Sequence, residues 1–187
     1  MPNKRVELIA EQQWLDTVGE RIQERMHAVY DSTPTGRKAK SILQGHWLGH
    51  PLHAALSDVP LGAWTVALAL DACEMTTGLR PMGVGADAAV NLGLLGAAAS
   101  AVTGWADWSE TDGRARRIGL AHGLLGIASI ACFAASSLAR NKNSRRLGRG
   151  LSLMGYAAAI VSGSLGGHLV FGEGVGVATS SSDPALK

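Results

Sequence analysis

The sequence has only two cysteines, Cys73 and Cys132, and both fall inside apolar segments. It therefore contains no disulfide framework and no paired-cysteine metal motif. The first 40 residues have no continuous apolar core long enough for a secretory signal peptide, so we expect the first membrane span to direct insertion. No nucleophile beside a base, phosphate-binding loop or nucleic-acid motif is present, which leaves catalysis on a soluble substrate and nucleic-acid binding unsupported.

Formal charge is absent from three long stretches of the chain, 88–106, 118–139 and 151–171. Each is close to the roughly 20 residues that a helix needs to cross the hydrocarbon layer of a membrane. A fourth stretch, 51–75, has polar ends but an uncharged core at 59–70. We therefore predict an all-α integral membrane protein, a bundle of four transmembrane helices in contact with the lipid bilayer.

The first 44 residues are polar and carry apolar side chains at helical spacing. This pattern predicts an amphipathic helix over about 6–29, either on the membrane surface or docked on the bundle. Pro34 and Gly36 in the stretch 31–44 indicate a linker. We expect three parts: an amphipathic helix and linker at 1–44, a four-helix transmembrane domain at 45–177, and a flexible tail at 178–187.

Basic residues near the span ends are balanced between the two sides of the membrane, so the positive-inside rule does not decide the orientation. Four further basic residues, Lys4, Arg5, Arg21 and Arg25, lie in the N-terminal extension. On that ground we expect a multi-pass protein of the cell inner (plasma) membrane with both termini in the cytoplasm. An oligomer is compatible with the small residues of the spans, which allow helices to approach closely.

Three intramembrane histidines come from three different spans. His53 lies in the first turn of span one, His122 near the start of span three, and His168 near the end of span four. Because successive helices alternate in direction, all three fall within one or two turns of the same interface. Polar groups inside a membrane are costly and commonly functional, so these histidines are the candidate cofactor-binding residues.

Other polar residues are expected on the same side of the membrane. Asp58 is a candidate fourth metal ligand. Asp107 is expected to accept a hydrogen bond from a histidine ring and so fix its tautomer. His50, which precedes Pro51, and Trp105 complete the candidate surroundings of the site.

Four sequence runs resemble the DUF2231 family of bacterial and archaeal four-helix membrane proteins. They are GHWLGHPLHAALSDVPLGAW, TGWADWS, GLAHG and GGHLVFGEGVGV, and the resemblance covers about residues 45–177. It implies a four-span bundle. Some relatives carry this domain fused to a Rieske-type iron–sulfur domain, which implies a redox role and a Rieske-type redox partner.

Three functions remain open from the residues. The first is electron transfer through a b-type haem held by His122 with His53 or His168. The glycines expected to make room for the macrocycle are Gly119, Gly123, Gly166 and Gly167. The second is a zinc or non-haem iron site made by His53, His122, His168 and Asp58. The third is a structural or assembly subunit in which the histidines bind neighbouring helices and no cofactor. The sequence does not decide whether the protein is an enzyme.

Overall fold

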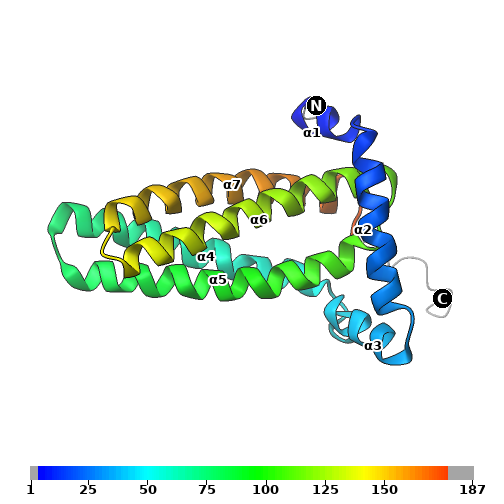
Figure 1. Ribbon diagram of the computed structural model, residues 1–187, viewed down its shortest axis with the longest axis horizontal. Coiled ribbons are helices and arrows are strands. Elements are labelled where there is room, and N and C mark those ends of the chain that lie inside the picture. The colour runs from blue at the N-terminus through cyan, green and yellow to red at the C-terminus, as the bar shows by residue number, and fades with distance from the viewer. Residues whose placement is uncertain (1–3, 177–187) are drawn as a thin grey trace. The chain divides into compact units, whose positions relative to one another are not determined.

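The computed structural model describes residues 4–176, and every regular element in that range is helical (Figure 1). The helices are α1 (Lys4–Ala10), α2 (Trp14–Tyr30), α3 (Pro34–Leu43), a short 3₁₀ helix (His46–Leu48), α4 (Leu52–Thr77), α5 (Arg80–Trp108), α6 (Gly113–Asn141) and α7 (Arg145–Phe171). The predicted tail at 178–187 lies outside the described residues.

The helices α4 to α7 are each long and apolar enough to cross a membrane. They contain the four predicted spans almost in full and extend most of them by several polar residues. A helix satisfies its own backbone hydrogen bonds, so it can continue past the apolar stretch. The prediction of an all-α protein with four transmembrane helices is confirmed.

The predicted amphipathic helix at 6–29 is present as two helices, α1 and α2, separated by residues 11–13. On α2 the buried residues are Leu15, Gly19 and Gln23, which recur every four positions and so share one face. The amphipathic pattern therefore identifies the burial of Leu15 but not the rest of the buried face, because Gly19 and Gln23 are buried while Val18 and Val29 are 42% and 68% exposed. It does not identify the break, because the apolar spacing continues across it.

The stretch 31–44, which composition predicts to be a linker, is largely helical. The Thr33 side chain accepts a hydrogen bond from the backbone N–H of Gly36 at 3.0 Å, and Pro34 occupies the first turn of α3. A threonine cap followed by proline is a favourable helix start. The same Pro and Gly residues that indicate a loop by composition thus begin a helix here.

The helices contribute to two compact units. Among the described residues, the first unit contains 4–53, 102–123 and 162–176, and the second contains 54–101 and 124–161. Each of the helices α4 to α7 supplies one segment to each unit. The N-terminal helices α1 to α3 belong wholly to the first unit.

The second unit is a four-helix bundle with an apolar core that contains two stacked aromatic rings. Trp64 of α4 stacks on Phe133 of α6, with ring centroids 3.9 Å apart and an interplanar angle of 7°. The indole N–H of Trp64 donates to the carbonyl oxygen of Val90 on α5 at 3.4 Å. Ala159 of α7 belongs to the same buried cluster. All four segments therefore meet in one core.

The second unit also contains a network of ion pairs around the buried side chains of Arg140 and Asp71, which we call the arginine–carboxylate network. Its members are Arg140, Arg145, Arg149, Asp71, Glu74 and Asp87. Arg140 donates from Nη1 to Asp71 Oδ1 at 3.0 Å and to Asp87 Oδ1 at 2.9 Å. Three positive and three negative groups balance one another, as buried charges require.

In the first unit, α2 packs on the end of α5 and the start of α6. Leu15 forms a buried cluster with Trp108 and Leu120. The Gln23 side-chain amide donates to the carbonyl oxygens of Trp108 at 2.9 Å and Thr111 at 2.8 Å. One buried side chain of α2 thus bonds the last carbonyl group of α5 and a carbonyl group of the loop that follows it.

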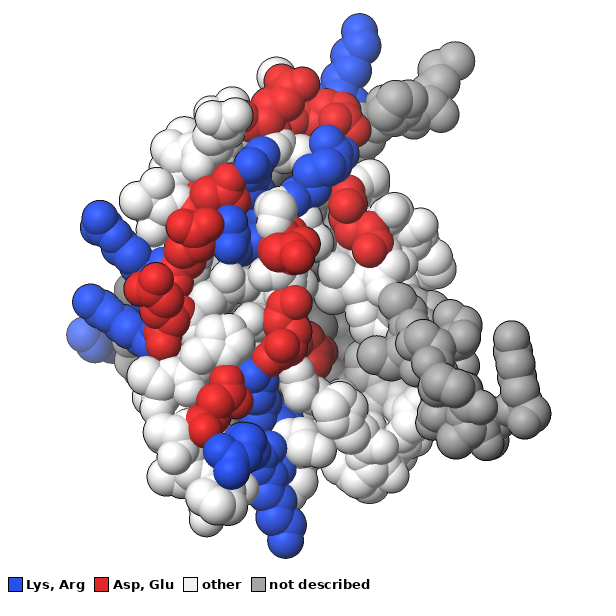
Figure 2. All heavy atoms as spheres, turned by 90° about the vertical axis from the view of Figure 1, so that its right-hand side faces the viewer, with Lys and Arg blue, Asp and Glu red and all other residues white. Residues whose placement is uncertain are grey.

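Ion pairs join α1 and α2 to the start of α6. Asp16 lies 2.8 Å from the guanidinium of Arg116 and 2.6 Å from that of Arg117, and Glu7 lies 3.0 Å from Arg114. Hydrogen bonds from Arg117 and Arg116 hold the pKa of Asp16 below its ordinary value. Figure 2 shows acidic and basic side chains next to one another on this side of the protein. Acidic side chains of α1 and α2 therefore compensate a basic segment of α6.

Helix α3 is held by a buried lysine. The ammonium group of Lys40 pairs with Glu110 and lies 3.4 Å from Asp31. Burial alone would lower the pKa of Lys40, but the two carboxylates outweigh it and raise the pKa. Lys40 therefore stays charged and fixes α3 beside the loop that joins α5 to α6.

Candidate histidine site

His122 is held in one orientation by α7. Its Nδ1 lies 2.8 Å from the carbonyl oxygen of Ser162 and 3.0 Å from the Ser162 hydroxyl oxygen. That hydroxyl group donates in turn to the backbone carbonyl of His122 at 2.9 Å. A carbonyl oxygen can only accept, so Nδ1 carries the hydrogen, and Nε2 of the neutral ring has a free lone pair. This is the tautomer of a metal-ligating histidine whose second nitrogen is fixed by a backbone carbonyl.

The His53 ring lies next to His122. The two ring centroids are 5.9 Å apart, and the planes meet at 85°. Two imidazoles bound to one metal through nitrogen–metal bonds of about 2.0–2.1 Å have centroids about 5–6 Å apart, depending on the angle at the metal. The observed separation is therefore compatible with a single metal centre between the two rings.

Two glycines allow the imidazoles to approach the neighbouring helices. A Cβ atom at Gly104 of α5 would lie 2.7 Å from Cε1 and Nδ1 of His53. A Cβ atom at Gly166 of α7 would lie 3.1 Å from Cε1 of His122. Any side chain at position 104 would displace the His53 ring. The segments of α4, α5, α6 and α7 in the first unit thus all help to position the pair.

His168 makes a different contact. Its Nε2 lies 3.5 Å from Oε1 of Glu173, and the same carboxylate accepts a hydrogen bond from Arg114 at 3.3 Å. Arg114 also pairs with Glu7 of α1. His168 thus belongs to a chain of ionisable groups at the end of α7. Within residues 4–176, no three His, Cys, Asp or Glu side chains are grouped so that they could hold a metal ion.

The remaining predicted residues each have different surroundings. His50 is exposed in the loop before α4, and Asp58 is exposed on the part of α4 that belongs to the second unit. Trp105 packs edge-to-face on Trp108 with centroids 5.3 Å apart. Asp107 is partly buried, and its carboxylate has no hydrogen-bond or ion-pair partner among the described residues. Ser162, and not a carboxylate, orients His122.

Sequence reasoning missed Ser162 and Gly104. Ser162 lies outside the four sequence runs, and its role rests on a backbone carbonyl, which every residue has. Gly104 lies in the run TGWADWS, but glycine is common in spans, so its contact with His53 could not be read from the run. Of the glycines expected to make room for a cofactor, Gly166 lies beside His122, whereas a Cβ at Gly119 would meet Trp108. Added Cβ atoms at Gly123 and Gly167 would meet nothing within 4 Å.

A comparison with protein families agrees with the presence of four helices that could span a membrane. The family described as "Predicted membrane protein (DUF2231)" matches residues 49–179, which include all four spans and both histidines of the pair. The chain therefore belongs to the DUF2231 family of predicted membrane proteins. No curated protein and no solved structure matches it.

Proposed function

We propose that this integral membrane protein transfers electrons through a b-type haem whose axial ligands are His53 and His122. The observation that carries the proposal is the orientation of His122. Its Nδ1–H donates to the Ser162 carbonyl oxygen, which leaves the lone pair of Nε2 for a metal. The centroid of its ring lies 5.9 Å from the centroid of the His53 ring. Such a pair of rings on different helices is the ligand arrangement that helix bundles use for cofactors.

Haem suits this pair because of the number of ligands it needs. The porphyrin supplies four nitrogens to the iron, so the protein must supply only the two axial groups. Zinc or non-haem iron would need further protein ligands, for which the candidates are His168 and Asp58. His53 and His122 meet the requirement of haem without a third side chain.

Bound haem would supply one-electron chemistry near one face of the membrane. The protein residues would fix the two axial imidazoles, and the low-dielectric surroundings would influence the reduction potential. A Rieske-type protein is the proposed redox partner, on the basis of the family resemblance. The proposed orientation, with both termini in the cytoplasm, follows from the basic residues of the N-terminal extension.

An absorption spectrum tests the proposal. The protein is produced in cells supplied with a haem precursor, purified in mild detergent, and measured oxidised and after reduction with dithionite. We expect a Soret band and, on reduction, the sharp α-band of six-coordinate haem. Iron and zinc are determined in the same sample, and iron without zinc is expected.

Histidine variants identify the ligands. His122→Ala and His53→Ala should each abolish the six-coordinate spectrum, because each removes an axial nitrogen. His46→Ala is the matched control, since His46 is exposed and its ring nitrogen bonds Ser41 at 3.1 Å. His168→Ala should also retain the spectrum. A protein that takes up no haem, or a His122→Ala variant with full haem content, would contradict the proposal.

A further inference from the structure

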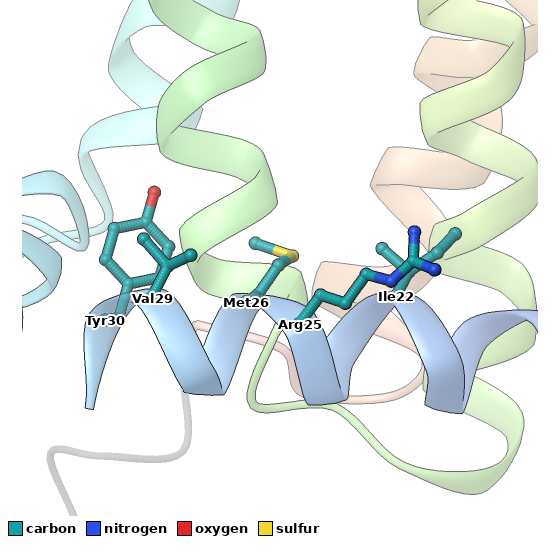
Figure 3. Close-up of a pocket in the computed structure, with 5 residues that line it drawn as sticks. All are labelled: Ile22, Arg25, Met26, Val29 and Tyr30. Carbon is teal, nitrogen blue, oxygen red and sulfur yellow. The ribbon is translucent and has the colours of Figure 1, made fainter. Parts of the chain in front are cut away.

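A groove runs along α2 in the first unit. It has a volume of about 330 Å³ and is lined by Ile22, Arg25, Met26, Val29 and Tyr30. Figure 3 shows these five side chains projecting from the same side of α2. The groove is largely open, and its described lining comes from α2 alone, so it can contact one side of a bound molecule but cannot enclose it.

The lining has two chemical parts. Ile22, Met26 and Val29 make an apolar strip, and Val29 is 68% exposed. Arg25 is exposed and forms no ion pair within the described part of the chain. It differs in this from Arg114, Arg116 and Arg117, each of which pairs with an acidic residue. The groove therefore combines apolar surface with one uncompensated positive charge.

The groove lies where the spans end. Ile22 and Met26 pack against the cluster that contains Trp108, the last residue of α5, and Leu120 of α6. The ends of membrane-spanning helices lie at the level of the lipid headgroups, and tryptophans are enriched there. Helix α2 lies at this level, packs on the protein with one face and leaves the apolar side chain of Val29 exposed beside that face. These are the properties of an interfacial helix.

We propose that this groove binds an anionic phospholipid. The Arg25 guanidinium pairs with the phosphate, because its fork of N–H groups matches phosphate oxygens. An acyl chain lies along Ile22, Met26 and Val29 and removes their apolar surface from water. The lipid thereby fills the space beside α2 and joins the N-terminal helices to the bilayer.

Native mass spectrometry of the full-length protein in detergent tests the site, with phosphatidylglycerol or phosphatidylcholine added at known concentration. We expect one tightly retained phosphatidylglycerol per chain and weaker retention of phosphatidylcholine. Arg25→Gln should lower the affinity for phosphatidylglycerol about fivefold, as expected for the loss of one basic side chain near an anionic lipid. Val29→Asn should weaken both lipids, because it places an amide in the apolar strip.

The matched control is Arg21→Gln. Arg21 is an exposed arginine on the same helix, without an ion pair among residues 4–176, but it does not line the groove. It should leave the affinity unchanged, and circular dichroism should show the same helix content in both variants. Equal effects of Arg25→Gln and Arg21→Gln would indicate general attraction to the headgroups and overturn the proposal. Equal retention of the two lipids by the unchanged protein would also overturn it.

Discussion

Both units use contacts between arginine and carboxylate, but among the described residues only the second unit has such a pair that is almost fully buried. In the second unit the side chains of Arg140 and Asp71 are 2% and 5% exposed. In the first unit those of Arg114 and Glu7 are 44% and 36% exposed. The network of the second unit connects the four spanning helices to one another, whereas the pairs of the first unit hold the N-terminal helices on α6.

The exposure of an ion pair determines how much its loss changes the free energy of unfolding. Removing one partner of a buried pair leaves a charge without compensation in a low-dielectric interior, which costs about 3–5 kcal/mol. An exposed pair contributes about 0.2–1 kcal/mol and is weakened by salt. We infer that the second unit depends on its charges for folding, while the first unit can lose one pair and keep its histidine site.

The largest effect is expected for Arg140→Met. Asp71 would remain buried with Arg149 at 3.4 Å and Arg145 at 3.9 Å as its remaining partners. The free energy of unfolding should fall by about 3 kcal/mol, the lower end of the range for a broken buried pair. Thermal unfolding in one detergent measures this.

Arg146→Met is the matched control for that variant. Arg146 is exposed on α7 and forms no ion pair among the described residues. It should change the unfolding free energy by less than about 0.5 kcal/mol. If the two variants unfold at the same temperature, the network is not required for stability.

Two glycine substitutions separate packing from the proposed site. At Gly93 in the second unit, an added Cβ would collide with the Trp64 indole. Gly93→Ala should therefore destabilise the core by about 1–3 kcal/mol and leave haem binding intact. At Gly104 in the first unit the collision is with His53, so Gly104→Ala should weaken haem binding. Absorption spectra measure the haem content of both variants, and melting curves measure their stability. Equal losses of haem and of stability in the two variants would contradict the prediction that only the first unit holds the haem.

The smallest effect is expected for the N-terminal helices. At 1 M salt the Debye length is about 3 Å, so the attraction between Asp16 and its arginines is weakened but not abolished, because these side chains are only 13–21% exposed. Hydrogen exchange of α2 should become faster in 1 M sodium chloride, while the Arg140 region should change little. Asp16→Asn should have a similar effect, worth about 0.5–1 kcal/mol. Glu11→Gln is the control, because Glu11 is exposed and unpaired among the described residues.

The contact of Asp16 with Arg116 and Arg117 should stabilise the docking of α2 less as the pH falls. The pKa of Asp16 is lowered in the folded protein by its hydrogen bonds with Arg117 and Arg116, so the folded state binds the proton less readily than the unfolded state. This contribution to docking is present at neutral pH and is lost as the pH falls through the lowered pKa, below the ordinary value of 3.8. The protection factors of the α2 amides, which correct for the slower intrinsic exchange in acid, should be lower at pH 3 than at pH 7, and equal protection factors would contradict the assignment.

The sequence predicts the spans well because uncharged stretches of about 20 residues have few alternatives to a membrane helix. It also predicts which face buries Leu15, from helical periodicity. The break between α1 and α2, the helix α3 and the partners of Arg140 could not be predicted, since they depend on contacts between segments far apart in the chain. The positions of the histidines in the spans predict that they lie near the same face of the membrane. The hydrogen bond of His122 with the Ser162 carbonyl and the contact of Gly104 with His53 depend on the packing of the helices and could not be predicted.

The central claim is that His53 and His122 together ligate one haem iron in the first unit. Electron paramagnetic resonance of the oxidised protein tests it directly, because two imidazole ligands make ferric haem low-spin. We predict a low-spin signal in the unchanged protein and its conversion to a high-spin signal, or its loss, in both His53→Ala and His122→Ala. A high-spin signal in the unchanged protein, or a low-spin signal that survives both substitutions, would contradict the claim.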